Sequence, residues 1–281
     1  MSLIIPANSL AGGGYQVDNS LRFNKPSSDS LSKTLGTPSS RDIFTVSAWV
    51  KMTGGGGVNQ IPIVSFDGSN QYMAIRFSTT FKFDVISYQG ATLGRLISTA
   101  FYRDYSAWYH VVVSIDSTQA TSSNRMKLYV NGEQITSLDT ATYPSINTDM
   151  ISASMTSVRV GAGVDQTATT SYFDGYISDT YFIDGQALTP TDFGEFDADS
   201  GVWKPIAYEG TYGTNGFYLE FKDSSALGDD TSGNSNDFTV NNLTSIDQTT
   251  DTPTNNFCTI NSVAVNTANI PTMTDGNLTA L

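Results

Sequence analysis

His110 is the only histidine of the chain and the first residue to consider for acid–base chemistry. A hydrolytic triad needs a base that hydrogen-bonds to a nucleophile, and an acid that orients the base. The sequence contains no G-x-S-x-G motif, and the only cysteine, Cys258, lies in a polar stretch. Tyr109 and Val111 flank His110 in a run of alternating apolar residues. We therefore predict that His110 is structural and that the chain has no catalytic nucleophile.

Paired carboxylates would indicate a second kind of hydrolysis, because glycosidases use two acidic side chains. A retaining glycosidase holds its two carboxyl groups about 5–5.5 Å apart, which an E-x-D-x-x-E strand provides by placing both on one face. No two of the glutamates are spaced at i, i+2 or i+4: these are Glu133, Glu195, Glu209 and Glu220. Glu195 and Asp197 come nearest to a pair, but they flank an expected helix end. The sequence predicts no glycosidase, and no other enzyme.

Oxygen-bearing side chains in loops are candidates for a cation-binding site, since Ca²⁺ takes about six to eight oxygen ligands. Asp67 and Asn70, in the run D-G-S-N, and Asp165 are the candidates. The run 229–237 resembles a calcium loop but lacks the terminal bidentate glutamate. Aspartate and asparagine are also the ordinary residues of turns. Two explanations therefore stay open, a calcium site and turn chemistry alone. No other cofactor is expected.

Three tyrosines are candidates for stacking on a sugar ring, namely Tyr72, Tyr88 and Tyr172. Each is predicted at a strand end or in a loop, where the ring could meet a sugar face and the hydroxyl could meet water. The alternative is ordinary packing of aromatic side chains inside a β-sandwich. The three tryptophans are expected to belong to the core: Trp49, Trp108 and Trp203.

The composition disfavours several partners. The chain has 27 acidic and 14 basic residues and a net charge of −13. This charge opposes binding to the phosphates of nucleic acids and to anionic lipid surfaces. No apolar run approaches the roughly 18 residues of a membrane-spanning helix. A single cysteine leaves no intrachain disulfide, which is typical of proteins that fold in a reducing cytoplasm.

The elements that must position these residues are strands. From Trp108 to Asp116, and again from Met126 to Val130, apolar and polar residues alternate with the period of two that strands require. Asn131-Gly132 provides the positive φ angles of a tight hairpin turn. The pattern predicts an antiparallel, all-β sandwich of two sheets.

Further strands and one short helix follow from the same reasoning. Strands are expected at 21–23, 44–50, 61–66, 72–77, 81–88, 93–98, 158–161, 173–183, 217–221 and 238–240. Thr189-Pro190 is expected to begin a short helix that ends near Phe196. The long segments 24–42 and 133–157 are expected to be polar loops. The domain organisation predicted is an N-terminal arm (1–19), a sandwich domain (20–243), and a polar linker or the start of a further domain (244–281).

The ordered series of motifs resembles a known family. F-T-V-S-A-W-V (44–50), W-Y-H-V-V-V-S-I-D (108–116), M-K-L-Y-V-N-G (126–132) and F-D-G-Y-I-S-D (173–179) resemble laminin-G-like, concanavalin A-like jelly rolls. With F-I-D-G-Q-A-L-T-P (182–190) and S-I-D-Q-T-T-D-T-P-T-N-N-F (245–257), the chain is similar to the laminin-G-like virion proteins of marine tailed bacteriophages.

The resemblance implies a two-sheet jelly roll on the surface of a phage particle, as a fibre, a spike or a capsid decoration, made in the cytoplasm of a bacterial host. It implies attachment to a host or a glycan without catalysis. A purely structural capsid or tail component is the alternative, and a polysaccharide depolymerase the least expected reading. Other virion proteins are expected to contact residues 1–19 and 244–281. The protein is expected to form a homo-oligomer, with a trimer the usual state of fibres.

Overall fold

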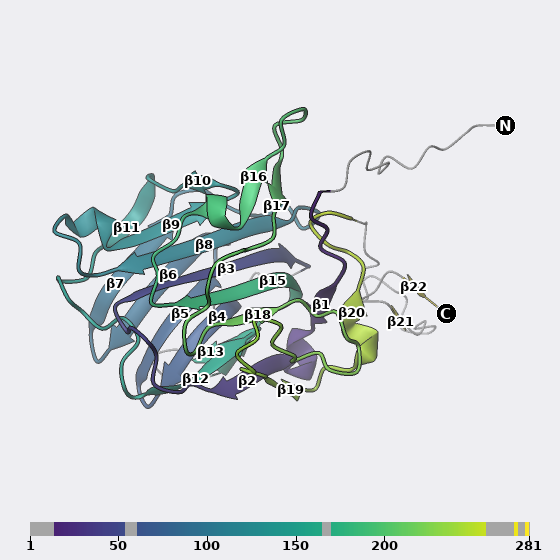
Figure 1. Cartoon of the computed structure of the whole chain (residues 1–281), viewed down its shortest axis with the longest axis horizontal. Helices are drawn as coiled ribbons and strands as arrows, with labels where there is room; N and C mark the ends of the chain where they lie inside the picture. Colours follow the sequence, from purple (N-terminus) through teal and green to yellow (C-terminus); the bar gives the residue numbers. More distant parts are fainter. Residues whose placement is uncertain (1–13, 54–60, 165–169, 257–272, 275–278, 281) are drawn as a thin grey trace.

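The structure is a computed structural model that describes residues 14–53, 61–164, 170–256, 273–274 and 279–280. Two large antiparallel sheets stack face to face and form a jelly-roll sandwich (Figure 1). The expected all-β fold class is confirmed. No helix among the described residues is long and apolar enough to cross a membrane.

Sheet A has eight strands in the order β10-β9-β8-β3-β15-β1-β20, with β18 also paired to β15. Its strands are β10 (Glu133–Gln134), β9 (Met126–Val130), β8 (Tyr109–Asp116), β3 (Ile43–Met52), β15 (Gly175–Asp184), β1 (Ser20–Phe23), β20 (Gln248–Thr249) and β18 (Phe217–Leu219). The turn between β9 and β10 is the expected one, because Asn131 has φ 49° and Gly132 has φ 84°.

Sheet B has eight strands in the order β11-β7-β6-β5-β4-β12-β2-β19. Its strands are β11 (Leu138–Thr142), β7 (Thr92–Ser98), β6 (Phe83–Gln89), β5 (Gln71–Phe77), β4 (Ile61–Gly68), β12 (Met155–Val160), β2 (Ser30–Thr34) and β19 (Thr239–Asn241). The remaining strands of the described residues form three small antiparallel pairs: β13 (Ala162–Val164) with β14 (Thr170–Tyr172), β16 (Gly194–Phe196) with β17 (Trp203–Pro205), and β21 (Met273–Thr274) with β22 (Thr279–Ala280).

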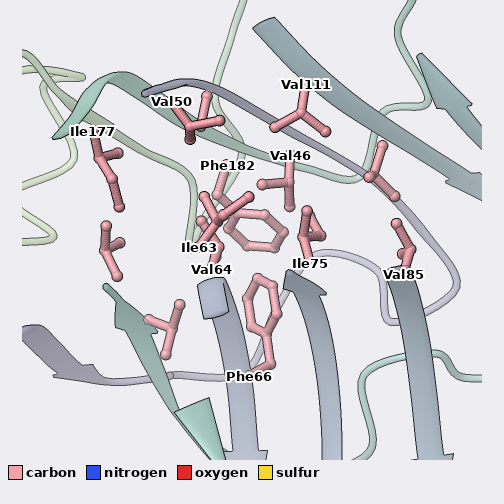
Figure 2. Close-up of a cluster of buried hydrophobic side chains, with 14 of the residues drawn as sticks. Val46, Val50, Ile63, Val64, Phe66, Ile75, Val85, Val111, Ile177 and Phe182 are labelled. Carbon is pink, nitrogen blue, oxygen red and sulfur yellow. The ribbon is translucent and has the colours of Figure 1, made fainter. Parts of the chain in front are cut away.

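The main core lies between the two sheets, where alternate side chains of each sheet meet (Figure 2). Val46 and Val50 of β3 point toward sheet B, as their alternation predicts. Phe182 of β15 lies against Phe66 of β4, with ring centroids 5.0 Å apart. Burial of apolar side chains of this size is the main favourable term in folding. The sandwich is therefore held together by contacts between strands distant in the sequence.

The outer face of the central strands of sheet A is buried as well, and side chains from residues 185–212 pack on it. Phe193 from this segment packs on Tyr181 of β15, with ring centroids 5.3 Å apart. Trp203 of β17 covers His110 of β8, with ring centroids 6.0 Å apart. Consequently all ten residues of β15 are buried, on both faces of the strand.

The predicted helix is a single turn. The described residues form four 3₁₀ helices of three residues each: η1 (Lys25–Ser27), η2 (Ser122–Asn124), η3 (Pro190–Asp192) and η4 (Ser245–Asp247). Thr189 precedes η3 as expected, and its backbone N–H donates to the carboxylate of Asp192 at 2.9 Å. The expected end near Phe196 is wrong, because Gly194–Phe196 pairs with β17 and the strand pairing replaces the helix.

Residues from the predicted arm and the predicted linker pack on the sandwich. Val17, from the expected arm, is 4% exposed, and its backbone N–H and C=O both bond to the Thr254 hydroxyl. β20, from the expected linker, pairs with β1, and Asp251 is fully buried. These segments dock through hydrogen bonds and charge rather than through apolar runs, which is why their composition resembled a linker. The rest of the predicted arm (1–13) and much of the predicted tail (257–272, 275–278, 281) lie outside the described residues.

A β-bulge in β15 holds a buried carboxyl group. The pairing of β15 with β3 shifts between Ser178 and Tyr181, and Asp179 at the bulge has φ 43°, which is rare for a residue with a side chain. Asp179 is 2% exposed. Its carboxyl group accepts hydrogen bonds from the hydroxyls of Tyr218, at 2.7 Å, and Tyr15, at 3.2 Å. Burial raises the pKa of Asp179 to about 7, although both hydrogen bonds act to lower it.

We expect Asp179→Asn to stabilise the protein at neutral pH. The folded state holds the proton of Asp179 more tightly than the unfolded chain, so ionisation lowers the free energy of unfolding of the wild type as pH rises from about 4 to about 7. The stability difference between the variant and the wild type should therefore grow over this interval, to a few kcal/mol at about 1.4 kcal/mol per pKa unit, and stay level at higher pH. Urea unfolding at pH 4, 5.5, 7 and 8 measures it. A difference that does not change with pH would contradict the assignment.

Candidate functional site

An open depression lies on the outer face of sheet B, where β12, β2 and β19 are adjacent strands. Arg159 of β12 pairs with Ser32 of β2, and Ser32 pairs with Thr239 of β19, so these side chains share one face. The depression has a volume of about 520 Å³ and a mainly polar lining. Its lining residues are Ser28, Ser30, Ser32, Arg159, Ala162, Thr170, Tyr172, Val240, Asn241 and Asn242.

The β13–β14 hairpin forms one wall of the depression, and two glycines allow it to do so. Gly161 has φ 76°, a conformation that favours glycine, and it turns the chain from β12 into β13. Gly163 lies against β4, where a Cβ atom would come within 2.8 Å of the Ser65 Cβ. A larger residue at either position would move the hairpin, and with it Tyr172 of β14.

The turn after β19 forms the opposite wall. Asn242 has φ 63°, and its side-chain amide donates to the Ser27 carbonyl at 2.8 Å. The amide of Asn241 donates to the Ser32 hydroxyl at 3.0 Å. These bonds fix two amide groups at the rim. Together with the hydroxyls of the floor, they form an array of donors and acceptors of the kind that binds sugar hydroxyl groups.

Arg159 is the charged residue of the depression, and its charge is only partly compensated. Its Nη1 atom lies 3.2 Å from Oδ2 of Asp67. The two atoms are not aligned for a hydrogen bond, and each is buried without a hydrogen-bond partner within the described ranges. Asp67 bonds instead to the Ser65 hydroxyl through Oδ1. Burial raises the pKa of Asp67, while the hydrogen bond from Ser65 and the charge of Arg159 act to lower it.

The three predicted tyrosines all map to the outer side of sheet B, but with different exposure. Tyr172 is partly buried and lines the depression. Tyr88 is partly buried and stacks on Tyr72, with ring centroids 5.7 Å apart. Tyr72 is 1% exposed and packs with Ala74 and Ile86. Tyr72 lies near the start of β5, as expected for a strand end, but its ring is covered, so it supports Tyr88 and has no free face.

The predicted calcium ligands do not converge in the part of the chain that the structure describes. Asp67 is 4% exposed and is directed to Ser65 and Arg159. Asn70 is an exposed turn residue with φ 55°, which fits the turn explanation. Asp165 lies outside the described residues. No group of three or more histidine, cysteine or acidic side chains that could hold a metal occurs among the described residues.

His110 is a core residue, as predicted. It is 1% exposed, and Trp203 donates from Nε1 to its Nδ1 at 3.0 Å. Because Nδ1 accepts, Nε2 carries the proton and donates to the Ser47 hydroxyl at 2.8 Å. Burial lowers the pKa of His110 to about 3. The expectation for the tryptophans is also confirmed, since Trp49, Trp108 and Trp203 are 4–8% exposed and cluster with Tyr176.

Sequence reasoning missed the residues that build the floor of the depression. Ser30 and Ser32 lie in a segment expected to be a loop, and Arg159 lies in an expected strand but was not singled out. A signal was present in both cases. Leu31 between two serines, and Arg159 between two valines, have the alternation of strands with one polar face.

Several solved structures are similar to the chain at low identity. A heptameric SAP-like pentraxin from Limulus polyphemus is 19% identical over 62% of this chain and 78% of its own, with a TM-score of 0.44. Domain 4 of an extracellular arabinanase from Geobacillus stearothermophilus, in complex with arabinotriose, is 16% identical over 53% and 64%, with a TM-score of 0.38. The CBM40 of Ruminococcus gnavus IT-sialidase, bound to α2,3-sialyllactose, is 14% identical over 58% and 89%, with a TM-score of 0.40.

The family assignment rests on a family model rather than on these structures. No curated protein matches the sequence. A laminin G model, described as the concanavalin A-like lectin/glucanases superfamily, matches residues 27–192, which is more than half of the chain. The match spans most strands of both sheets, including β2 and β12 of the depression. The chain therefore belongs to the concanavalin A-like lectin/glucanases superfamily.

Proposed function

We propose that this lectin-like domain binds glycans at the depression on sheet B and catalyses no reaction there. The observation that carries the proposal is the lining itself. Serine hydroxyls, two fixed amides and a guanidinium group surround a space of about 520 Å³, with Tyr172 beside them. Sugars present hydroxyl groups at their edges and C–H groups on their faces, which suit such donors and an aromatic ring respectively.

Glu195 and Asp197, which come nearest to a glycosidase pair in the sequence, do not suit glycoside hydrolysis in the structure. Lys204 lies 3.3 Å from a Glu195 oxygen and 3.2 Å from an Asp197 oxygen. Hydrogen bonds from Ser200 and from Lys204 lower the pKa of Asp197. A general acid needs the opposite, a carboxyl group that keeps its proton near neutral pH. This pair is arranged as a surface ion cluster, which supports the non-catalytic proposal.

We propose that this domain lies on a phage particle, where it would attach the particle to a glycan of the bacterial host. The support is the resemblance of the motifs at 44–50, 108–116, 126–132, 173–179 and 245–257 to virion proteins. An open site of this kind gives weak single contacts, but many tethered copies raise the overall affinity by roughly 10²–10⁴. In this proposal residues 1–19 and 244–281 contact other virion proteins, and a homo-oligomer supplies the multiple copies.

We expect Tyr172→Ala to lower the affinity for a bound glycan at least about tenfold, which corresponds to roughly 1.4 kcal/mol. The ring would no longer flank the depression, while the strands beneath it stay in place. A glycan array finds the ligand, and calorimetry with the purified chain measures the loss. Tyr105→Ala is the matched control, since Tyr105 is 42% exposed and is not part of the depression. If the array shows no reproducible binding, the proposal fails and the purely structural role is favoured.

A further inference from the structure

We infer that the glycan bound in the depression is acidic, and that Arg159 holds its carboxylate or sulfate group. This inference rests on the proposed glycan binding and adds the chemical class of the ligand. Arg159 is the one charged residue in the described lining of the depression. The chain has 27 acidic residues, yet none of the described ones lines this site. The local charge of the lining is thus opposite to the charge of the whole protein.

The hydrogen-bonding capacity of Arg159 is unused in the described structure. A guanidinium group has five N–H donors in a planar fork, which matches a carboxylate or a sulfate. The side chain of Arg159 is 29% exposed, so an approaching anion can reach it. Its contact with Asp67 is an ion pair without an aligned hydrogen bond, and Nη1 has no hydrogen-bond partner elsewhere in the described ranges. Nη1 is itself buried against Asp67, so an anionic group would bind the exposed part of the guanidinium fork.

Arg95, on the same face of sheet B, is a useful comparison because its guanidinium group already donates hydrogen bonds to a carboxylate. Its side chain is 30% exposed, almost the same as that of Arg159. Its Nε and Nη2 atoms, however, both donate to the buried carboxylate of Asp84, at 2.9 Å each. Arg76 donates to the same carboxylate at 3.0 Å. Arg95 is therefore committed within the sheet, and it lies outside the depression.

Asp67 acts as an internal competitor of the ligand. Its side chain is 5% exposed, so it lies beneath Arg159 rather than in the open space. Its negative charge reduces the attraction of Arg159 for an incoming anion. Removing that charge should strengthen the binding of acidic glycans and leave neutral glycans unaffected. Such a gain distinguishes charge recognition from a structural role of Arg159, because a structural role predicts no gain.

The test uses the full chain and a glycan array that includes oligogalacturonates and sulfated galactans beside their carboxyl-reduced and desulfated forms. Each glycan that binds is measured again by calorimetry after its acidic groups are removed. We expect binders to be acidic and neutralisation to weaken binding at least about tenfold. Comparing each carboxylated glycan with its reduced form, and each sulfated glycan with its desulfated form, shows which of the two acidic groups is recognised. Neutral forms that bind equally well would overturn the inference while leaving the proposed glycan binding intact. An array without any binder would overturn both.

Three variants complete the test. R159Q should weaken the binding of acidic glycans at least about tenfold. The ratio of the affinity for an acidic glycan to that for its neutral form should then be close to one. R95Q removes the same charge outside the depression and should change neither value. D67N should raise the affinity for acidic glycans several-fold. Should R159Q fail to fold, as judged by its thermal melting, R159K replaces it. R159K keeps the charge but loses the planar fork, so a smaller preference for acidic over neutral glycans is expected. An unchanged preference in R159Q, or in R159K where it serves as the replacement, would overturn the inference.

Discussion

Replacing Asp251 by asparagine should lower the free energy of unfolding by about 3–5 kcal/mol, the usual effect of removing one partner of a buried ion pair. The Lys51 Nζ atom lies 2.7 Å from Asp251 Oδ2, and the two side chains are 1% and 0% exposed. Trp108 donates from Nε1 to the other carboxylate oxygen at 3.1 Å. The substitution keeps the shape of the side chain and removes the negative charge that Asp251 places beside the buried ammonium group of Lys51.

Urea unfolding at pH 7 measures this effect, and Asp139→Asn is the matched control. Asp139 pairs with Lys82 at the surface, where its side chain is 43% exposed, and exposed pairs contribute about 0–1 kcal/mol. The loss in Asp251→Asn should also appear as faster hydrogen exchange in residues 248–256, since Asp251 holds this segment on sheet A. A variant within about 1 kcal/mol of the wild type would show that the pair does not hold the segment.

Trp203→Ala should cost about 3–5 kcal/mol of stability, as expected for removal of a large buried aromatic side chain. Trp203 is 8% exposed and fills a space formed by two glycines. A Cβ atom on Gly132 would lie 2.4 Å from its ring, and one on Gly194 would lie 2.5 Å from it. The alanine variant would therefore leave a cavity over His110 that opens to solvent.

The same variant should change the titration of His110. Burial lowers the pKa of His110 to about 3, and access of water in Trp203→Ala should raise it toward the ordinary value of about 6.5. Proton NMR of the single imidazole ring follows this directly. Trp203→Phe is the control: it keeps a ring over His110 but leaves Nδ1 without its donor, at a cost of about 1–3 kcal/mol. An imidazole that titrates near 6.5 in the wild type would contradict the buried arrangement.

Charge and hydrogen bonding hold described residues of the predicted arm and linker on the sandwich. Residues 244–256 contain few apolar side chains, so they resembled a linker. In the structure they are held by the Lys51–Asp251 pair, by the hydroxyl of Thr254 on Val17, and by the pairing of β20 with β1. Each of these interactions needs a partner at least 200 residues away. Composition in a local window contains no information about such partners.

Strand alternation and a turn signal were sufficient to predict the sandwich, and the apolar run around His110 was sufficient to predict its structural role, because these are local properties of the chain. The alternation at 44–50 and 108–116 placed Val46 and Val113 in the core, and Asn131-Gly132 marked a hairpin that the structure contains. The absence of paired glutamates also followed from the sequence alone. These features depend on side-chain period and turn geometry, and neither requires knowledge of which strands are neighbours.

Only the tertiary structure decided which polar residues share a site. β2, β12 and β19 come from three distant parts of the sequence, and the order of sheet B makes them adjacent. That order brings Ser32, Arg159 and Asn241 to one depression, and it covers Tyr72 while leaving Tyr172 at the wall. The physical reason is that a strand's pattern fixes which of its side chains face outward. Which strand lies beside it, and what then covers those side chains, follows from the packing of the whole chain.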